Sequence, residues 1–176
     1  MSGTGAKAGR RDDIVAVALE LLDAHGLPEL SMRRIAGALG MQPSALYWHF
    51  PDKQTLLGAV AADVLGAPEA SGPEALALDL RDRLLGRRDA AELVSSASAL
   101  GHCRIPHSEL LRSAALAAGA DDARAAAAAS AAVLYTLGWV LHAQQRSVAE
   151  ALGAASPDAP EPAPYADGLE LILGGL

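Results

Sequence analysis

Residues 31–53 combine cationic, hydroxyl and imidazole side chains with a single acidic residue. The basic residues are Arg33, Arg34 and Lys53, and the acid is Asp52. Arginine can hold a guanine edge or a phosphate, and the free N–H groups after a capping residue such as Asp52 form an anion site at a helix start. This segment can therefore recognise nucleic acid. The sequence contains no Gly-x-Ser-x-Gly, phosphate-loop or His-Glu-x-x-His motif that would indicate catalysis instead.

Two short helices are predicted to position these groups. Ser31 can cap the first helix, which ends at Gly40 and has the apolar face Met32, Ile35, Ala36 and Leu39. The second helix begins at Pro43, which suits a first helical turn, and runs to about His49. Its inward-facing residues are Leu46 and Phe50. In such a helix-turn-helix the second helix enters the major groove with its N-terminal end first.

Two longer helices are predicted to flank this pair. Asp12 or Asp13 can cap the preceding helix, whose apolar stripe is Ile14, Val17, Ala18, Leu21 and Leu22. Asp52 can cap the following one, a connecting helix at about 52–66. Residues 1–9 are rich in Gly, Ser and Ala and are expected to be a flexible N-terminal arm. A DNA-binding domain is thus predicted over residues 10–55.

The rest of the chain, residues 67–176, is predicted to form a second helical domain. Ala and Leu dominate and β-branched residues are sparse, so the expected fold class is all-α. After a hinge at Gly66–Gly72, helices are expected at about 74–86, 89–100, 106–118 and 121–152. A Pro-rich loop, Ser156–Pro164, precedes a last helix with Leu169, Ile172, Leu173 and Leu176 on one face.

Residues 31–57, SMRRIAGALGMQPSALYWHFPDKQTLL, resemble the DNA-binding segment of the TetR family of bacterial regulators. The match extends without a gap from about Asp12 to Leu57, and Tyr47-Trp48-His49 is similar to the tetracycline repressor branch. The resemblance implies a three-helix DNA-binding domain and a C-terminal domain for ligand binding and dimerisation. It also implies DNA contacts from Ser31, Arg33, Pro43, Ser44, Ala45, Tyr47, His49 and Lys53. Pro43 departs from the polar base-reading side chain of that branch, so the operator sequence cannot be transferred.

The residue types suggest how these contacts would divide. Pro43, Ser44 and Ala45 are small and suit thymine methyls, which leaves Arg33 and Tyr47 as the expected sources of base specificity. His49 and Lys53 fit phosphates. Trp48 and Phe50 are expected in the core, and Arg34 is expected to be either a solvated charge or a phosphate contact.

In the second domain, Leu137–Ser147 and Gly168–Leu176 resemble the two helices that form a four-helix dimer interface in this family. Such apolar helices would leave a large exposed patch on a monomer. The expected effector region lies between the hinge and this interface, with His102, Arg104, His107, Trp139 and His142 as candidate ligand-binding residues.

Two features of this region have alternative interpretations. The His102–Pro106 segment is similar to one that holds a metal-chelated drug in the family, so Mg²⁺ is expected only for a tetracycline-like effector, and otherwise no cofactor or metal. His102 and His107 could equally be polar loop residues. Cys103 is expected to be an inert, partly buried thiol, with a redox switch as the alternative.

The net charge of −7 at first argues against a nucleic-acid partner. Residues 1–54, however, carry six basic and six acidic residues, whereas residues 55–176 carry eight and fifteen. The acidity thus lies outside the predicted DNA-binding segment. One cysteine, no signal peptide, and apolar stretches expected to be broken before membrane length predict a cytoplasmic protein without a membrane partner.

Together these features predict a homodimeric repressor that binds a palindromic operator in double-stranded DNA and leaves it when a small-molecule effector binds. The alternatives are a DNA-binding regulator without a ligand and, less favoured by the sequence, a small all-α enzyme.

Overall fold

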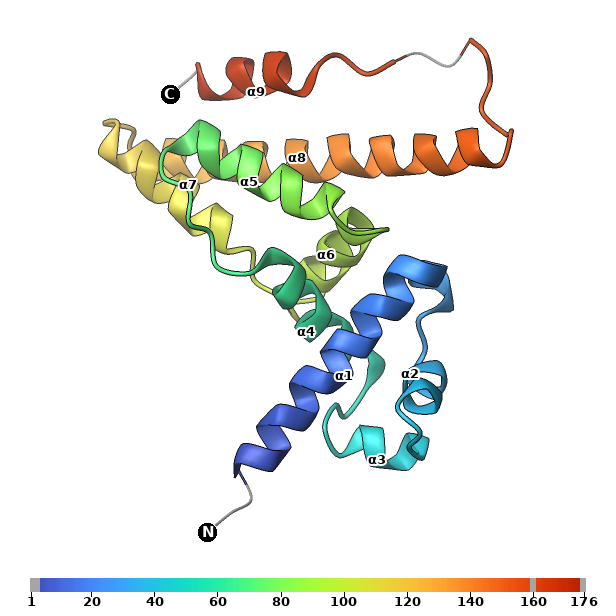
Figure 1. Cartoon of the computed structure of the whole chain (residues 1–176). Helices are drawn as coiled ribbons and strands as arrows, with labels where there is room; N and C mark the ends of the chain where they lie inside the picture. Colours follow the sequence, from blue (N-terminus) through green and yellow to red (C-terminus); the bar gives the residue numbers. More distant parts are fainter. Residues whose placement is uncertain (1–3, 159–160, 175–176) are drawn as a thin grey trace. The chain divides into compact units, whose positions relative to one another are not determined.

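The computed structural model describes residues 4–158 and 161–174, and in these ranges all regular secondary structure is helical (Figure 1). The predicted all-α fold class is therefore confirmed. The chain forms two compact units. The N-terminal unit comprises Met1–Val64 and Arg87–Arg104, and the C-terminal unit comprises Leu65–Gly86 and Ile105–Leu176.

The N-terminal unit is built around a helix-turn-helix. Its elements are α1 (Thr4–His25), the 3₁₀ turn η1 (Leu27–Glu29), α2 (Met32–Ala38), α3 (Pro43–Tyr47), most of α4 (Lys53–Leu65), and α6 (Ala90–Ala99). The apolar spacings predicted from the sequence become its core, which includes the fully buried Ile14, Leu22, Leu30, Ile35, Leu46, Phe50 and Leu56. Gly40 makes the tight turn between α2 and α3, because its φ of 64° lies in the left-handed region that favours glycine.

Local capping sets the starts of two of these helices. The Ser31 hydroxyl accepts a hydrogen bond from the Arg34 backbone N–H at 3.3 Å, and the Asp52 carboxylate accepts one from Thr55 at 2.7 Å. Both caps were predicted. The start of α1 differs from the prediction, since the helix begins at Thr4 within the expected flexible arm. The strong helix formers Ala, Lys and Arg in residues 6–11 extend it toward the N-terminus.

The position of α6 also differs from what chain order suggested. Residues 89–100 were expected in the second domain, but their contacts place α6 in the N-terminal unit. The turn before α6 attaches it to the end of α1: the Asp89 carboxylate accepts the Leu27 N–H at 2.8 Å, and Arg87 forms an ion pair with Asp23. These long-range polar contacts cannot be recognised from the local pattern of the sequence.

The C-terminal unit is organised around one long helix. Its elements are α5 (Pro73–Leu85), α7 (Pro106–Ala117), α8 (Asp122–Ala151) and α9 (Tyr165–Leu173). α8 packs against α5, α7 and α9 (Figure 1). Its buried side is formed by Ala125, Ala129, Ala132, Val133, Thr136, Leu137 and Val140. Small alanine side chains let the neighbouring helices approach closely.

An aromatic cluster attaches α9 to its neighbours. The buried Tyr165 hydroxyl lies 3.1 Å from the Ala77 carbonyl oxygen of α5 and 2.7 Å from Thr136 Oγ1 of α8. The Tyr135 hydroxyl donates to the Tyr165 carbonyl at 3.0 Å, and the two rings stack with centroids 5.3 Å apart. A Cβ at Gly168 would lie 2.2 Å from the Tyr135 hydroxyl oxygen, so this close approach requires glycine.

α8 differs from the expectation that every apolar stretch is broken before it reaches membrane length. Residues 125–145 contain no charged side chain, and by length and composition alone α8 could cross a membrane. A protein-core helix can have the same composition. The buried side of α8 packs within the helical C-terminal unit, so its apolar character has a structural use there.

Candidate nucleic-acid interface

α3 is anchored on one face and exposed on the other. Leu46 and Phe50 are fully buried, because positions four apart share a helix face. The residues predicted to read DNA lie on the other side: Pro43, Ser44 and Tyr47 are exposed, and Ala45 and His49 are half-buried. The structure therefore presents the predicted recognition helix with its polar and small side chains accessible.

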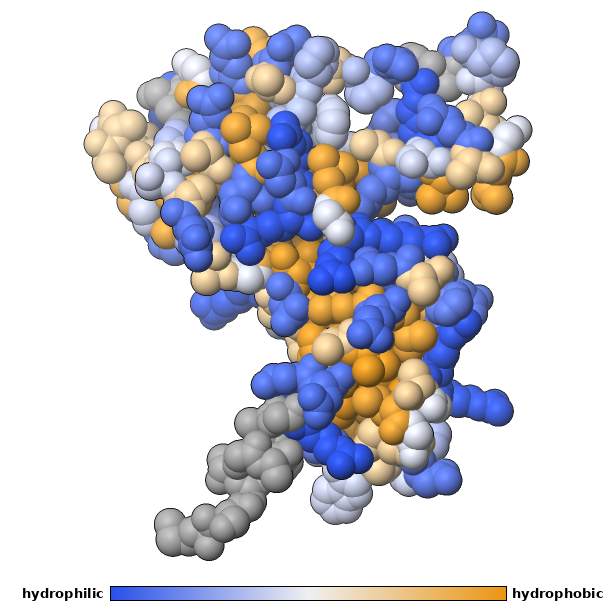
Figure 2. All heavy atoms as spheres, viewed as in Figure 1, coloured by the Kyte–Doolittle hydropathy of each residue, from blue (hydrophilic) through white to orange (hydrophobic). Residues whose placement is uncertain are grey.

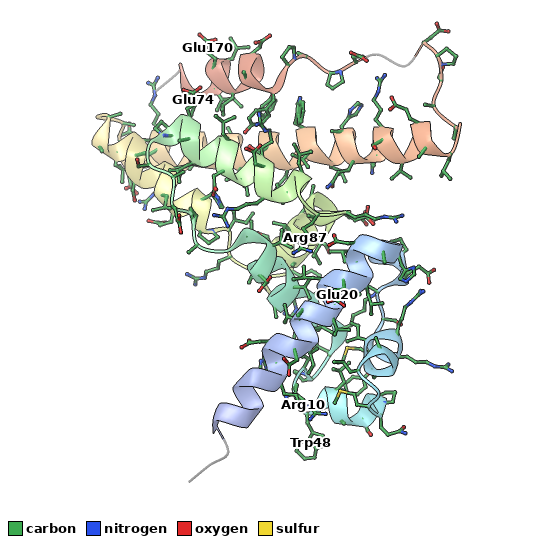
Figure 3. The ribbon with its side chains drawn as sticks, in the orientation of Figure 1. Arg10, Glu20, Trp48, Glu74, Arg87 and Glu170 are labelled. Carbon is green, nitrogen blue, oxygen red and sulfur yellow. The ribbon has the colours of Figure 1, made fainter. Side chains whose placement is uncertain are left out.

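Trp48 corrects the prediction that both aromatic residues after Tyr47 are core. Phe50 is fully buried as expected, but Trp48 is 82% exposed and projects outward beside the end of α3 (Figure 3). The physical reason is its position two residues from both Leu46 and Phe50, which turns it to the opposite side. Trp48 is thus an additional candidate DNA contact, which the helical spacing by itself could have identified.

The two arginines of α2 have different environments. Arg34 forms an ion pair with Glu29, which supports its interpretation as a surface charge. Arg33 is exposed, and no carboxylate pairs with it within the described part of the chain. Arg33 is therefore the better placed of the two to contact DNA. Ser31 is exposed next to it, with its hydroxyl engaged in capping α2.

The start of α4 carries a second exposed basic residue of this unit, in addition to Arg33. Lys53, its first residue, is exposed. The hydrogen bond from the Thr55 backbone N–H lowers the pKa of Asp52, so this carboxylate is ionised at neutral pH. Because Asp52 already occupies the Thr55 N–H, an anion at this helix start would be left with Lys53 and the N–H groups before Thr55.

The five candidate effector residues are divided between the two units. His102 and Arg104 follow α6 in the N-terminal unit, whereas His107, Trp139 and His142 lie in the C-terminal unit. The His102 backbone packs so closely on α4 that a Cβ at Gly58 would lie 2.4 Å from its carbonyl oxygen.

The two candidates on α8 differ in exposure. The Trp139 indole N–H donates to the Ala163 carbonyl at 3.1 Å, and its ring packs edge-on against Tyr165 at 5.4 Å. Trp139 thereby helps to hold the segment before α9. His142 is exposed on α8.

His107 is fully buried at the start of α7 and is not a polar loop residue. Its Nε2 lies 2.8 Å from Asp79 Oδ2 on α5, and Arg83 Nε donates to the same oxygen at 2.7 Å. Burial lowers the pKa of His107, and the Asp79 carboxylate offsets this only in part, so the imidazole is neutral at pH 7 with its proton on Nε2. Its buried Nδ1 has no hydrogen-bond partner among the described residues.

Asp79 and Arg83 were not identified from the sequence, although their spacing of four residues on a helix is a recognisable ion-pair signal. Burial would raise the pKa of Asp79, but the hydrogen bonds from Arg83 and His107 outweigh it and lower the pKa. Arg83 also donates to the Ala67 carbonyl at 3.1 Å. A chain of polar contacts thus links α7, α5 and the segment that follows α4, all within the C-terminal unit.

The surroundings of Cys103 and the placement of the metal-ligating residue types give little support for a redox or metal site. Cys103 is buried and burial raises the pKa of its thiol, which is the environment of an inert cysteine. Over the described ranges, no three His, Cys, Asp or Glu side chains lie close enough together to hold a metal ion.

Comparison with known proteins agrees with this geometry. Residues 14–60 match the family model described as bacterial regulatory proteins, tetR family. The structure resembles Mycobacterium smegmatis BioQ with a TM-score of 0.82 and 38% identity, covering 94% of this chain and 96% of BioQ. A structure of BioQ with its natural double-stranded DNA operator superposes with a TM-score of 0.76 and 37% identity, over the same shares of the two chains.

Two further relatives widen the comparison. A transcriptional regulator from Saccharopolyspora erythraea is 36% identical over 139 residues, which cover 74% of this chain but only 59% of that regulator. A variant of TetR from Acinetobacter baumannii AYE, solved in complex with minocycline, has a TM-score of 0.71 and 28% identity, covering 93% and 94% of the two chains. With a relative of comparable length at 38% identity and a matched DNA-binding segment, the chain belongs to the TetR family of bacterial transcriptional regulators.

Proposed function

We propose that this protein is a cytoplasmic transcriptional repressor that binds a palindromic operator as a homodimer and is released by a small-molecule effector. The observation that carries the proposal is the orientation of α3. Leu46 and Phe50 anchor the helix while Pro43, Ser44, Tyr47 and Trp48 remain accessible. BioQ, a relative over almost its whole length, has been solved with its operator DNA.

Each candidate contact has a role that fits its position. Arg33 and Tyr47 supply base specificity, with Pro43, Ser44 and Ala45 allowing close approach to the bases. Lys53 and His49 bind phosphates beyond the C-terminal end of the reading helix, which both residues follow in the chain. Ser31 contributes through its cap, which sets the start of the helix that carries Arg33.

Dimerisation through α8 and α9 is supported by their exposed apolar surface. Leu134 and Leu171 are 63% and 81% exposed, and apolar side chains are also accessible toward the C-terminal end of α8 (Figure 2). A groove of about 580 Å³ between α5 and α9 is lined by apolar residues, among them Pro73, Leu78, Leu169 and Leu173, together with the carboxylates Glu74 and Glu170. A two-fold dimer would cover such a surface and set two α3 helices about 34–36 Å apart, one turn of DNA.

Effector binding is proposed within the C-terminal unit, where His107, Trp139 and His142 are the candidate contacts; the other two candidates, His102 and Arg104, belong to the N-terminal unit. The strongest support is the buried His107, whose unpaired Nδ1 is a hydrogen-bond acceptor in its neutral form. The minocycline complex of the Acinetobacter relative supports a ligand-responsive mechanism, with Mg²⁺ required only for a chelating drug of that type. The effector must bind the DNA-free state more tightly, because only differential affinity shifts the equilibrium.

The test is binding to the palindrome nearest the gene that encodes the protein. Wild type should bind this duplex more tightly than a random duplex, and the double variant Arg33→Ala/Tyr47→Ala should lose the difference. Equal binding by both proteins would refute the proposal. In a salt titration, Lys53→Ala should flatten the dependence of log K on log salt by about one unit if Lys53 contacts a phosphate. A regulator without a ligand would keep its operator affinity in the presence of every compound tested.

A further inference from the structure

Arg11 makes two contacts with the segment that follows the recognition helix. The side chain comes from α1, and one guanidinium nitrogen donates a hydrogen bond to the His49 backbone carbonyl. The guanidinium carbon lies 4.2 Å from the centroid of the Phe50 ring. All three residues belong to the N-terminal unit, and Arg11 is itself exposed, so its charge costs little to place there.

α3 needs support at this end. The helix has only five residues, and isolated helices of that length are unstable in water. Its last turn contains no basic residue to interact with the free carbonyl groups. Leu46 and Phe50 hold one face, and the Leu46 carbonyl accepts the His49 and Phe50 backbone N–H groups, whereas the His49 carbonyl accepts the Arg11 side chain. A cation at the carboxyl end of a helix interacts favourably with its dipole, and the face of Phe50 fits the flat guanidinium.

We propose that Arg11 is a positioning residue for DNA reading: it fixes the carboxyl end of α3, and therefore Tyr47 and Trp48, before DNA arrives. This inference rests on the proposed function. An arginine near the start of the first helix would otherwise be interpreted as a phosphate contact. The two roles predict different results. A phosphate contact contributes to the affinity for every DNA sequence, whereas a positioning contact contributes only to the affinity for the operator.

The test compares three variants: Arg11→Met, Arg11→Lys and the control Arg10→Met. Met keeps the aliphatic stem without the charge or donors, and Lys keeps the charge without the flat face that lies over Phe50. Arg10 is the exposed neighbour on α1, so its replacement removes an equal charge from the same turn (Figure 3). Each protein is titrated with the operator palindrome and a random duplex at several salt concentrations, and amide hydrogen exchange of the free protein is measured.

For Arg11→Met, operator affinity should fall about tenfold while random-duplex affinity and the salt slope stay near wild type. Amide exchange over residues 43–50 should be faster before any DNA is added. Arg11→Lys should fall between Arg11→Met and wild type. Arg10→Met should keep the ratio of operator to random affinity within about twofold.

Two outcomes would overturn the inference. If Arg11→Met lowers both affinities together and flattens the salt slope by about one unit, Arg11 is a phosphate contact. If Arg11→Met or Arg11→Lys binds the operator like wild type with unchanged exchange, the contact is dispensable. Should Arg11→Met fail to fold, Arg11→Lys decides between these results. A wild-type protein that does not distinguish operator from random duplex would instead refute the proposed function.

Discussion

Tyr47 and Trp48 are the two large aromatic side chains that the end of α3 exposes, at 49% and 82% of their surface. Replacing either ring should change the free energy of folding of the protein only a little, since an exposed ring contacts few other residues. Their energetic contribution is expected in the DNA complex, where the Tyr47 ring can contact a base while its hydroxyl donates to a phosphate, and the Trp48 ring can pack on the duplex.

Tyr47→Phe should weaken operator binding about tenfold, because it removes one hydrogen bond to a charged group worth ~1.5 kcal/mol. The free energy of unfolding should stay within about 0.5 kcal/mol of wild type, as for other surface changes. Fluorescence anisotropy of a labelled operator and urea unfolding measure the two quantities. A loss of stability equal to the loss of binding would show that Tyr47 packs rather than reads.

Trp48 provides its own spectroscopic test. In a Trp139→Phe background, Trp48 is the single tryptophan, and its exposed ring should change its emission when operator is added. The reverse background, Trp48→Phe, leaves Trp139 in the C-terminal unit and should respond less. Equal responses from the two proteins would contradict the placement of Trp48 at the DNA interface.

His107 makes stability depend on pH in a defined direction. Burial lowers its pKa below the ordinary 6.5, so the unfolded chain binds a proton at a higher pH than the folded protein does. The stabilisation is therefore complete above pH 6.5 and is lost as pH falls from 6.5 toward the lower folded pKa. Asp79 acts below this window, because its lowered pKa keeps it charged in the folded protein below 3.8.

Urea unfolding midpoints at about pH 7.5 and about pH 5.5 test this dependence. Wild type should lose stability on acidification, and His107→Asn should lose less, although it starts about 1–3 kcal/mol lower because Asp79 loses one of its two hydrogen-bond donors and keeps only Arg83. His142→Gln is the matched control, since His142 is exposed on α8. A wild-type protein that gains stability on this acidification would rule out the buried neutral imidazole.

At the scale of elements, two helical glycines of the N-terminal unit differ only in their surroundings. Gly58 in α4 faces the His102 backbone, where a Cβ would lie 2.4 Å from a carbonyl oxygen, whereas a Cβ at Gly37 in α2 would meet nothing within 4 Å. The first glycine permits α4 to pack against the loop after α6. At Gly37 there is room for a larger side chain, so no packing contact requires glycine there.

Gly58→Ala should therefore destabilise the protein by about 1–3 kcal/mol, since backbone must move to admit the methyl group. Gly37→Ala should stabilise it by about 0.5–1 kcal/mol, because alanine has the lower entropic cost in a helix. Thermal unfolding of the two variants side by side provides the measurement. Similar effects of the same sign would mean that the close approach of α4 and the His102 loop is not maintained in solution.

At the scale of the whole molecule, the exposed leucines of α8 and α9 bear on assembly. Leu171→Asp changes both halves of a two-fold interface, so it should weaken the dimer by about 100-fold or more. Leu100→Asp is the control: this leucine is 56% exposed at the end of α6, in the N-terminal unit, and should leave the dimer intact. Sedimentation measures both, and a wild-type monomer at micromolar concentration would contradict the proposed dimer.

Local patterns in the sequence predicted most of the helices and which face of α3 is buried. Ser31, Asp52 and Asp121 cap helices through N–H groups three residues away, and Leu46 with Phe50 mark a buried face by a spacing of four. These interactions join residues that lie within one or two helical turns of each other, so they can be recognised in the sequence without knowledge of the tertiary structure. Trp48 could have been placed by the same spacing, because it lies between these two core residues on the opposite side.

Which distant residues meet depends on the packing of the helices. α6 belongs with α1 because Asp89 and Arg87 bond to residues more than sixty positions earlier, and His107 is buried against Asp79 twenty-eight positions away. Arg11 reaches the carboxyl end of α3 across thirty-eight positions. No local pattern specifies such pairs, because they depend on how whole helices pack and on the desolvation of each polar group that the packing buries.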